Sequence, residues 1–157
     1  MSEPRHAARD LVFDTNAVVH LFRKSPLGHA LRSVYGLASR EWRPLLSAVT
    51  VGELHSLALQ WNWDASRVAQ LDALLLAFPV IEVYADSASL CDAYAEIDCA
   101  ARRSGARMGK NDLWIAATAK IRGGVVVTAD RDFDAPGSAG LVSVDVFDPA
   151  GALLASW

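Results

Sequence analysis

Cysteine is scarce in this chain of 157 residues, which contains only Cys91 and Cys99. The two cysteines lie eight residues apart in a helical pattern, which separates them by about 12 Å along a helix axis and prevents a disulfide between them. The sequence therefore argues against a disulfide-stabilised fold. We expect both thiols to be small core residues of a protein in the reducing cytosol.

A long apolar run and an excess of basic residues are also lacking. No window reaches the roughly 18 apolar residues that a membrane span requires, and the first ten residues, MSEPRHAARD, contain no apolar core of a secretory signal. The formal net charge of −3 and the pI of about 5.7 argue against nucleic-acid binding through a broad basic face. We therefore expect a cytoplasmic protein with no membrane partner.

The residues that are present are typical of one globular α/β domain. Hydrophobic residues make up 52% of the chain and charged residues 21%. Short apolar stretches alternate with helical patterns, which predicts a three-layer α/β domain with a mainly parallel sheet of four to five strands. We expect residues 1–10 to be a flexible tail and residues 11–157 to be the single domain. The predicted strands lie in DLVF, RPLLSAVT, VIEVY, GGVVVT and LVSVDVFD.

Apolar stripes at helical spacing predict the main helices. The segment SRVAQLDALLLAF ends before Pro79, and a long helix runs from about Asp86 to Arg103. In TVGELHSLALQW, the stripe continues to Trp61, which we expect in the core. Trp63 lies in the following turn and is expected to be exposed, where it would anchor a partner helix.

Four acidic residues follow predicted strands or begin predicted helices. In an open parallel sheet, the crevice outside the carboxyl ends of the strands is the usual ligand site. The topology should bring at least three of the four acids to that end. They are Asp14 after the first strand, Asp130 after the valine-rich strand, Asp112 at the start of KNDLWIAATAK, and Glu53 in the first turn of TVGELHSLALQW.

Short acids at helix starts and turns are common, so each of the four also has a structural explanation. Thr50 and Glu53 fit the capping box S/T-x-x-E, in which the Glu side chain bonds back to the backbone amide of the cap. Asn111 would cap its helix, with Asp112 in the first turn beside the positive end of the helix dipole. The acid after the first strand would cap a helix, and the one after the valine-rich strand would form a turn.

A convergent cluster of carboxylates favours one kind of chemistry. Like charges repel, so such a cluster either keeps a proton at a raised pKa or binds a hard cation. Oxygen ligands without Cys or His nearby suit Mg²⁺ or Mn²⁺ better than zinc. A cation held in this way can activate water and neutralise charge on a phosphoryl group.

Four segments, taken in order, resemble the PIN-domain ribonucleases, and within them the VapC-like toxins of type II toxin–antitoxin pairs. They are FDTNAVV, SAVTVGEL, KNDLWIAATA and VVTADRDF, within roughly Leu11 to Val146. The resemblance implies an α/β/α PIN-like domain and a Mg²⁺-dependent or Mn²⁺-dependent endoribonuclease that cleaves RNA phosphodiesters with a metal-activated water. It also implies a homodimer that is neutralised by a small cognate antitoxin.

The resemblance also implies which residues form the site. Asp14 and Asp112 would be the metal ligands. The stretch TADRDF offers two candidates for the fourth acid, and we favour Asp130 over Asp132 because it is closer to the strand end. The expected catalytic residues are Asp14, Glu53, Asp112 and Asp130, and the expected supporting residues are Thr15, Asn16, Asn111 and Asp132.

The segment ARRSGARMGK precedes Asp112 and carries Arg102, Arg103, Arg107 and Lys110. These residues would either border the acidic pocket and hold RNA phosphates or complement the dipole at the end of the preceding helix. Two other functions fit the same sequence. One is a PIN-fold nuclease without an antitoxin, acting on DNA flaps or in RNA processing. The other is a catalytically idle interaction module whose acids only cap helices and bind no metal.

Overall fold

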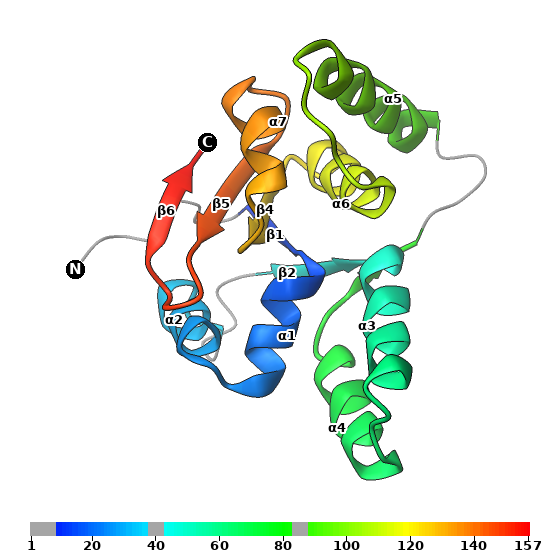
Figure 1. Ribbon diagram of the computed structural model, residues 1–157, viewed down its shortest axis with the longest axis vertical. Helices are drawn as coiled ribbons and strands as arrows, with labels where there is room; N and C mark the ends of the chain where they lie inside the picture. Colours follow the sequence, from blue (N-terminus) through cyan, green and yellow to red (C-terminus); the bar gives the residue numbers. More distant parts are fainter. Residues whose placement is uncertain (1–8, 38–42, 83–87) are drawn as a thin grey trace.

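The computed structural model describes residues 9–37, 43–82 and 88–157, which form a six-stranded sheet with helices on both faces (Figure 1). The strands are β1 (Asp10–Phe13), β2 (Arg43–Ser47), β3 (Val80–Ile81), β4 (Val125–Thr128), β5 (Ser143–Phe147) and β6 (Leu153–Ser156). The helices are α1 (Thr15–Arg23), α2 (Pro26–Val34), α3 (Ala48–Gln60), α4 (Ala65–Leu75), α5 (Ala88–Arg103), α6 (Lys110–Ile121) and α7 (Asp134–Ser138), with a 3-10 turn, η1 (Arg131–Phe133).

The sheet has the strand order β3-β2-β1-β4-β5-β6 and is parallel up to β5. The predicted α/β fold with a mainly parallel sheet is therefore confirmed. The sixth strand, β6, pairs antiparallel with β5 and was not predicted, because LLAS is a short apolar segment beside the end of the chain. Of the predicted strand VIEVY, the structure describes Val80–Ile81 as strand, and residues 83–84 lie outside the described residues.

Both faces of the central strands are buried. Along β1, the side chains of Leu11 and Phe13 join the core on the side of helices α1 to α4, whereas Val12 joins the core beneath α5 and α6. This alternation follows from the two-residue period of a strand. It explains why β1 and β4 are continuous apolar runs, since an unbroken run is what a strand needs when helices cover both faces.

Two expectations about α5 are corrected or limited by the structure. Cys91 and Cys99 are both exposed and not in the core. One face of α5 packs on the core through Leu90 and Ile97, and both cysteines lie off that stripe. The predicted start near Asp86 and residues 1–8 of the predicted tail lie outside the described residues. No helix in the three described ranges is long and apolar enough to cross a membrane.

Candidate active site

Asp14 lies between the ends of two adjacent strands. It is the N-cap of α1, as the sequence suggested, and its carboxylate accepts hydrogen bonds from the Thr15 amide at 2.6 Å and the Thr128 hydroxyl at 2.8 Å. Its own amide donates to the Val127 carbonyl of β4 at 3.0 Å. Only 4% of Asp14 is exposed, and burial raises the pKa of its carboxyl to about 7 despite these hydrogen bonds.

Asn16 fixes the loop that follows β4. Its side-chain oxygen accepts a hydrogen bond of 2.9 Å from the Ala129 amide, and its side-chain nitrogen lies 3.4 Å from the Thr128 hydroxyl. The Thr128 hydroxyl in turn accepts a hydrogen bond of 2.9 Å from the Asp130 amide. The first turn of α1 therefore positions the next acid along this edge of the sheet.

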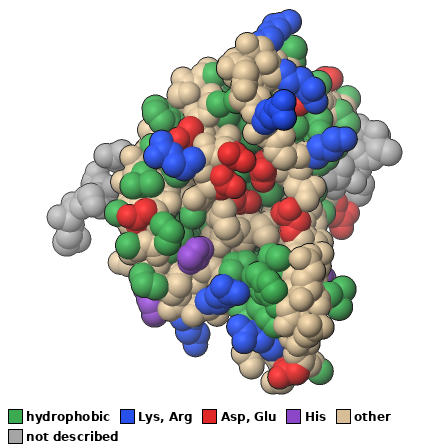
Figure 2. Space-filling model, in the orientation of Figure 1, with side chains coloured by type: hydrophobic (Ala, Val, Ile, Leu, Met, Phe, Trp, Pro, Cys, Tyr) green, Lys and Arg blue, Asp and Glu red, His purple; other side chains and the backbone are tan. Residues whose placement is uncertain are grey.

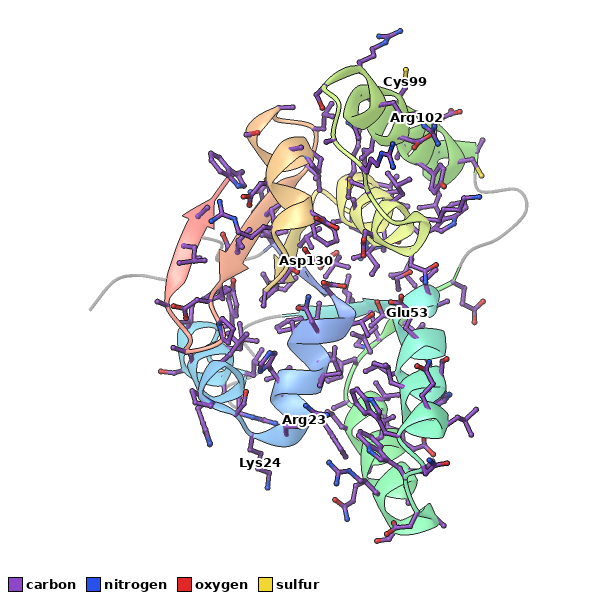
Figure 3. All side chains as sticks on the ribbon, viewed as in Figure 1. Arg23, Lys24, Glu53, Cys99, Arg102 and Asp130 are labelled. Atoms are coloured by element: carbon purple, nitrogen blue, oxygen red, sulfur yellow. The ribbon has the colours of Figure 1, made fainter. Side chains whose placement is uncertain are left out.

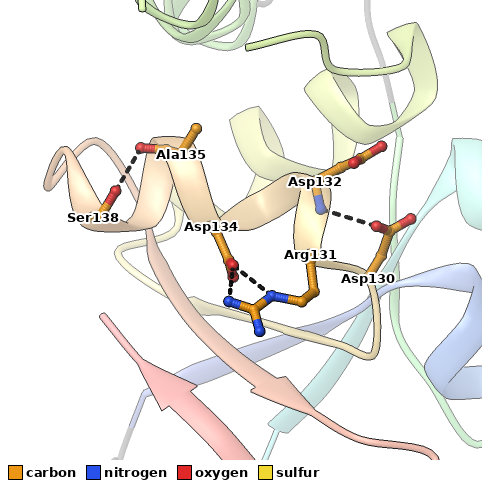
Figure 4. A network of polar contacts seen from close by, with 6 residues as sticks. All are labelled: Asp130, Arg131, Asp132, Asp134, Ala135 and Ser138. Atoms are coloured by element: carbon orange, nitrogen blue, oxygen red, sulfur yellow. Dashed lines mark hydrogen bonds and ion pairs between the residues drawn. The ribbon is translucent and has the colours of Figure 1, made fainter.

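Asp130 begins the η1 turn and accepts a hydrogen bond of 2.9 Å from the Asp132 amide, so the predicted turn-forming role is confirmed (Figure 4). The neighbouring cation, Arg131, pairs instead with Asp134, with a hydrogen bond of 2.7 Å from Nε to Oδ2. Asp130 lines the same pocket as Asp14, whereas Asp132 does not. Burial and the nearby Asp130 raise the pKa of Asp132.

Glu53 comes from the second turn of α3, and the capping-box prediction for it is wrong. The helix begins three residues earlier than the capping box requires, at Ala48, and Ser47 caps it through a hydrogen bond from the Val49 amide. The Glu53 carboxylate is therefore not occupied by its own helix end. One oxygen accepts a hydrogen bond from the Thr15 hydroxyl and the other a hydrogen bond of 2.7 Å from Asn111 Nδ2.

Asp112 lies in the first turn of α6, as predicted, but Asn111 does not cap that helix. The N-cap is Gly109, which has no side chain to serve as a cap, and Asp112 accepts a hydrogen bond from the Gly109 amide. A Cβ atom at Gly109 would lie 2.7 Å from an oxygen of Asp112, so glycine leaves room for this carboxylate. Burial, followed by repulsion from Asp130 and Glu53, raises the pKa of Asp112 to about 6.

These residues line one pocket of about 300 Å³ at the carboxyl end of the central strands. Figure 2 shows the acidic side chains gathered at the centre of this face, and Figure 3 shows Glu53 and Asp130 approaching it from different elements. The pocket is lined by Asp14, Thr15, Asn16, Val19, His20, Glu53, Leu57, Trp61, Asp112 and Asp130. The crevice lies between β1 and β4, where the connections of the sheet diverge to opposite sides.

The donor chemistry of this pocket fits a hard divalent cation. All four acids offer carboxylate oxygens, and within the described residues no Lys, Arg or His forms an ion pair with any of them. Burial raises the pKa values of Asp14 and Asp112, repulsion from neighbouring carboxylates adds to the rise, and no paired positive charge among the described residues offsets it. In the same described ranges, no group of three or more acidic, His or Cys side chains is already drawn together around one ion position.

The pocket contains four residues that the sequence argument did not assign to it. They are Val19, His20, Leu57 and Trp61. Helical spacing signals two of them, because His20 lies one turn after Asn16 on α1 and Leu57 lies one turn after Glu53 on α3. His20 is further oriented by a hydrogen bond of 2.7 Å between its Nδ1 and the Ser25 hydroxyl.

The predicted environments of the two tryptophans in QWNWD are wrong: Trp61, expected in the core, is exposed, and Trp63, expected to be exposed, packs against the core. Trp61 is 40% exposed and lines the pocket, whereas Trp63 is half-buried and stacks on Phe22 at a centroid distance of 5.0 Å. The stripe of α3 stops at Gln60, and Asn62 adopts a left-handed conformation with φ of 49°. That turn places Trp63 against the core. Because α3 ends before Trp61, the helical spacing of its apolar residues does not predict where the Trp61 side chain lies.

The four basic residues ahead of Asp112 do not line the acidic pocket. All are exposed, and Arg102 forms a two-oxygen contact with Asp98, one turn earlier on α5, at 2.9 and 3.0 Å. Arg102 lies in the last turn of α5, and Figure 3 shows it away from Asp130. This position fits the complementary charge expected at a helix C-terminus. The residues are Arg102, Arg103, Arg107 and Lys110.

Solved structures share this fold. A chain from VapBC2 of Rickettsia felis bound to a promoter DNA fragment matches with a TM-score of 0.72 and 21% identity, over 88% of this chain and 98% of that one. A chain from FitAcB of Neisseria gonorrhoeae matches at 0.66 and 26%, over 88% and 97%. A chain from VapBC-5 of Mycobacterium tuberculosis, a member of the VapBC family of toxin–antitoxin systems, matches at 0.64 and 26%, over 87% and 97%.

The family assignment comes from the sequence itself. Residues 11–138 match the model of the PIN domain, which is most of the chain, and the protein belongs to the PIN-domain family. Comparison with curated protein sequences gave no match. Membership of this family supports a hydrolase that acts on nucleic acid, and the predicted resemblance is confirmed at the level of the family and its fold.

Proposed function

We propose that this protein is a divalent-metal-dependent endoribonuclease and the toxin of a toxin–antitoxin pair. The observation that carries the proposal is the pocket in which Asp14 and Asp112, both with a raised pKa, lie with Glu53 and Asp130 and without a cationic side chain paired to them among the described residues. Family membership supports the hydrolase class. The oxygen-only donor set favours Mg²⁺ or Mn²⁺ over zinc.

Asp14 and Asp112 are the proposed metal ligands. A cation between them would stabilise the ionised forms that burial and repulsion now disfavour. A divalent ion at this place would activate water and offset the charge that develops on the phosphoryl group. Thr128 orients Asp14 through its hydroxyl, which limits the directions in which the carboxylate can present its oxygens to a ligand.

Glu53 and Asp130 complete the acidic rim in this proposal. Thr15 and Asn111 each donate to Glu53, so the carboxylate is held from both sides and cannot rotate away from the pocket. Asn16 holds the loop that carries Asp130 through the Ala129 amide. Asp132 stays a peripheral member, since it contributes a backbone amide to Asp130 rather than a side chain to the pocket.

The partners are proposed from the structural relatives. VapBC-5, one of these relatives, is described as a member of a toxin–antitoxin family, which supports a small cognate antitoxin for this protein. A homodimer is proposed from the resemblance to VapC-like toxins alone. RNA is the proposed substrate. We keep Arg102, Arg103, Arg107 and Lys110 as candidates for remote phosphate contacts outside the pocket, since all four are exposed.

Cleavage assays test this proposal. The wild-type chain should cut single-stranded RNA with Mg²⁺ or Mn²⁺ and not with chelator, whereas Asp14→Asn and Asp112→Asn should each lose at least about a hundredfold in rate. Asp72→Asn is the matched control, because Asp72 is exposed, pairs with His55 and does not line the pocket. Full activity in either pocket variant would refute the assigned site.

A second set of measurements separates the competing functions. Side-by-side cleavage of RNA and flap DNA distinguishes a ribonuclease from a DNA-processing PIN nuclease. An idle interaction module would bind no Mn²⁺ in calorimetry, and its melting temperature would be the same in metal and in chelator. Growth arrest on expression, relieved by the product of a neighbouring small gene, would support the toxin assignment.

A further inference from the structure

An aromatic and basic surface borders the acidic pocket. We call it the tryptophan shelf and define it as Phe22, Arg23, Trp61, Trp63 and Arg67. Phe22 and Trp63 stack at 5.0 Å with an interplanar angle of 26°, and Trp63 lies 5.5 Å from the ring of Trp61. Figure 2 shows hydrophobic side chains with Lys or Arg beside them below the central acidic group. The shelf therefore joins α1 to the turn between α3 and α4.

Trp61 belongs to both the shelf and the acidic pocket. Its side chain is 40% exposed, although a buried position is usual for a ring of this size, and it lines the pocket together with Asp14 and Asp112. Packing against Trp63 supports the ring from one side. An indole that is both supported and accessible beside a site for phosphodiester chemistry suits stacking with a planar ligand.

Two arginines supply positive charge at this surface. The Arg23 guanidinium lies 4.6 Å from the centre of the Trp61 ring, and the Arg67 guanidinium lies 4.5 Å from that of Trp63. Among the described residues, neither arginine forms an ion pair with an acid. Asp64 lies in the adjoining pocket, but it accepts its hydrogen bond from the Arg67 backbone amide and caps α4.

This combination matches a nucleotide better than an apolar partner. A purely apolar ligand on these rings would leave both guanidinium groups without an anion, and desolvating an unpaired charge is costly. A phosphate satisfies an arginine through charge-assisted hydrogen bonds, and a nucleobase stacks on an indole. An RNA strand approaching four carboxylates also needs positive charge near them, and Arg23 supplies it over the ring of Trp61, in the adjoining pocket.

We infer that the tryptophan shelf is a nucleotide subsite for single-stranded RNA. A base next to the scissile phosphodiester stacks on Trp61, and a neighbouring phosphate binds Arg23, with Arg67 continuing the path. The strand is single because a base within a duplex already has both of its faces stacked. This inference rests on the proposed ribonuclease function and adds a residue, Trp61, that favours single-stranded over duplex RNA.

Binding without cleavage tests the subsite separately from catalysis. The full wild-type chain is titrated into a fluorescein-labelled single-stranded RNA of about ten nucleotides in chelator at low salt, and anisotropy gives Kd. Trp61→Leu, which keeps apolar bulk but no ring, should weaken binding about tenfold or more, whereas Trp61→Phe should stay close to wild type. Leu59→Ala, an exposed change on the same helix, should have no effect.

The arginine has its own matched pair of variants. Arg23→Gln should weaken binding and flatten its salt dependence, because one phosphate contact is lost. Lys24→Gln removes the same charge one residue further on, from a side chain that lines neither pocket, and should change Kd little. Figure 3 shows the two residues diverging at the end of α1. A duplex of the same sequence should be insensitive to Trp61→Leu.

The outcomes distinguish this inference from the proposed function. If the wild type cuts RNA with metal but folded Trp61→Leu binds the single strand as tightly as wild type, the subsite is wrong and the nuclease assignment stands. If the wild type cuts no RNA under any metal, the proposed function fails first. If Trp61→Leu loses only the affinity for a protein partner, the shelf is a protein-docking surface and the inference is overturned.

Discussion

The side-chain amide of Asn111 donates a hydrogen bond of 2.7 Å to Oε1 of Glu53, which joins the start of α6 to the second turn of α3. The Thr15 hydroxyl donates to the other oxygen of the same carboxylate. Glu53 is therefore held by the first turns of α1 and α6. Asp14 caps the first turn of α1, and Asp112 lies in the first turn of α6. Hydrogen bonds through Glu53 therefore link the parts of α1, α3 and α6 that form the pocket.

Removing Asn111 should impair cleavage more than stability. Asn111→Ala deletes an exposed hydrogen bond, which contributes about 0.5–1.5 kcal/mol at most to folding, but it releases one side of Glu53. We expect a loss of about tenfold in kcat/KM. Glu53→Gln keeps an acceptor for Asn111 and removes the charge, so it should lose more. Urea unfolding and steady-state cleavage measure the two effects, and wild-type kinetics for Asn111→Ala would contradict a positioning role.

The fourth acid can be identified by comparing two neighbouring variants. Asp130→Asn should reduce cleavage by about tenfold or more, because Asp130 lines the pocket, while its side-chain oxygen can still accept from the Asp132 amide. Asp132→Asn should change the rate little, since its side chain lies outside the pocket. Rates for both variants at saturating metal make the comparison. The opposite order of effects would move the assignment to Asp132.

The free energy of unfolding of the metal-free protein should fall as the pH rises through the pKa values of Asp112 and Asp14. Burial raises the pKa of Asp14 to about 7, and burial with repulsion raises that of Asp112 to about 6, from the ordinary aspartate value of 3.8. Between the ordinary pKa and the raised pKa of each carboxyl, the folded state binds more protons than the unfolded state. The two carboxyls therefore contribute to stability at low pH, and this contribution is lost as the pH rises toward neutrality.

Thermal melting in chelator from about pH 4.5 to pH 7.5 measures this effect. Asp14→Asn removes one of the two groups, and the side-chain oxygen of the new amide can still accept from the Thr128 hydroxyl. Its melting temperature relative to wild type should therefore rise with pH, by about 2–4 °C per kcal/mol recovered. Excess Mn²⁺ should raise the melting temperature of the wild type most at the higher pH. A pH-independent difference between the two proteins would count against the raised pKa.

Thr50 offers a test of the corrected start of α3. Its hydroxyl is buried and has no hydrogen-bond partner in the described structure, whereas a capping box would make it the essential cap. Thr50→Val should therefore be neutral or stabilising by up to about 1 kcal/mol in urea unfolding. Ser47→Ala, at the observed cap, should cost about 1 kcal/mol. If Thr50→Val were the more harmful change, the cap would lie at Thr50.

Local patterns predicted those features that short-range physics controls. The apolar runs of β1 and β4 were found because burial on both faces removes polar residues from a strand. Asp14 and Asp130 were placed correctly at strand ends, and both cap the turn that follows them, because a cap bonds to amides within a few residues. Asp112 was likewise found in the first turn of its helix.

Hydrogen-bond partners across the pocket were not predictable in the same way. Thr50 with Glu53 satisfied a local motif, and Asn111 satisfied a local cap preference, yet Ser47 and Gly109 begin those helices. The cap lies two residues earlier than predicted at α6 and three residues earlier at α3, which changes the angle about the helix axis between cap and side chain by about 200° and 300°. The hydrogen bond between Glu53 and Asn111 depends on which face of α3 packs against α6, and this packing is a tertiary feature.

The sequence by itself determined the family, through motifs in a fixed order. It also determined the mainly parallel sheet and the convergence of at least three of the four acids at its carboxyl end, because hydrophobic period and chain order fix strand direction and strand ends. Only the tertiary structure decided the exposures of Trp61 and Trp63, the outward position of both cysteines and the hold on Glu53 from two helices. A pattern along one helix records that a face is apolar. What that face meets depends on where the helix ends and on side chains that are distant in the chain.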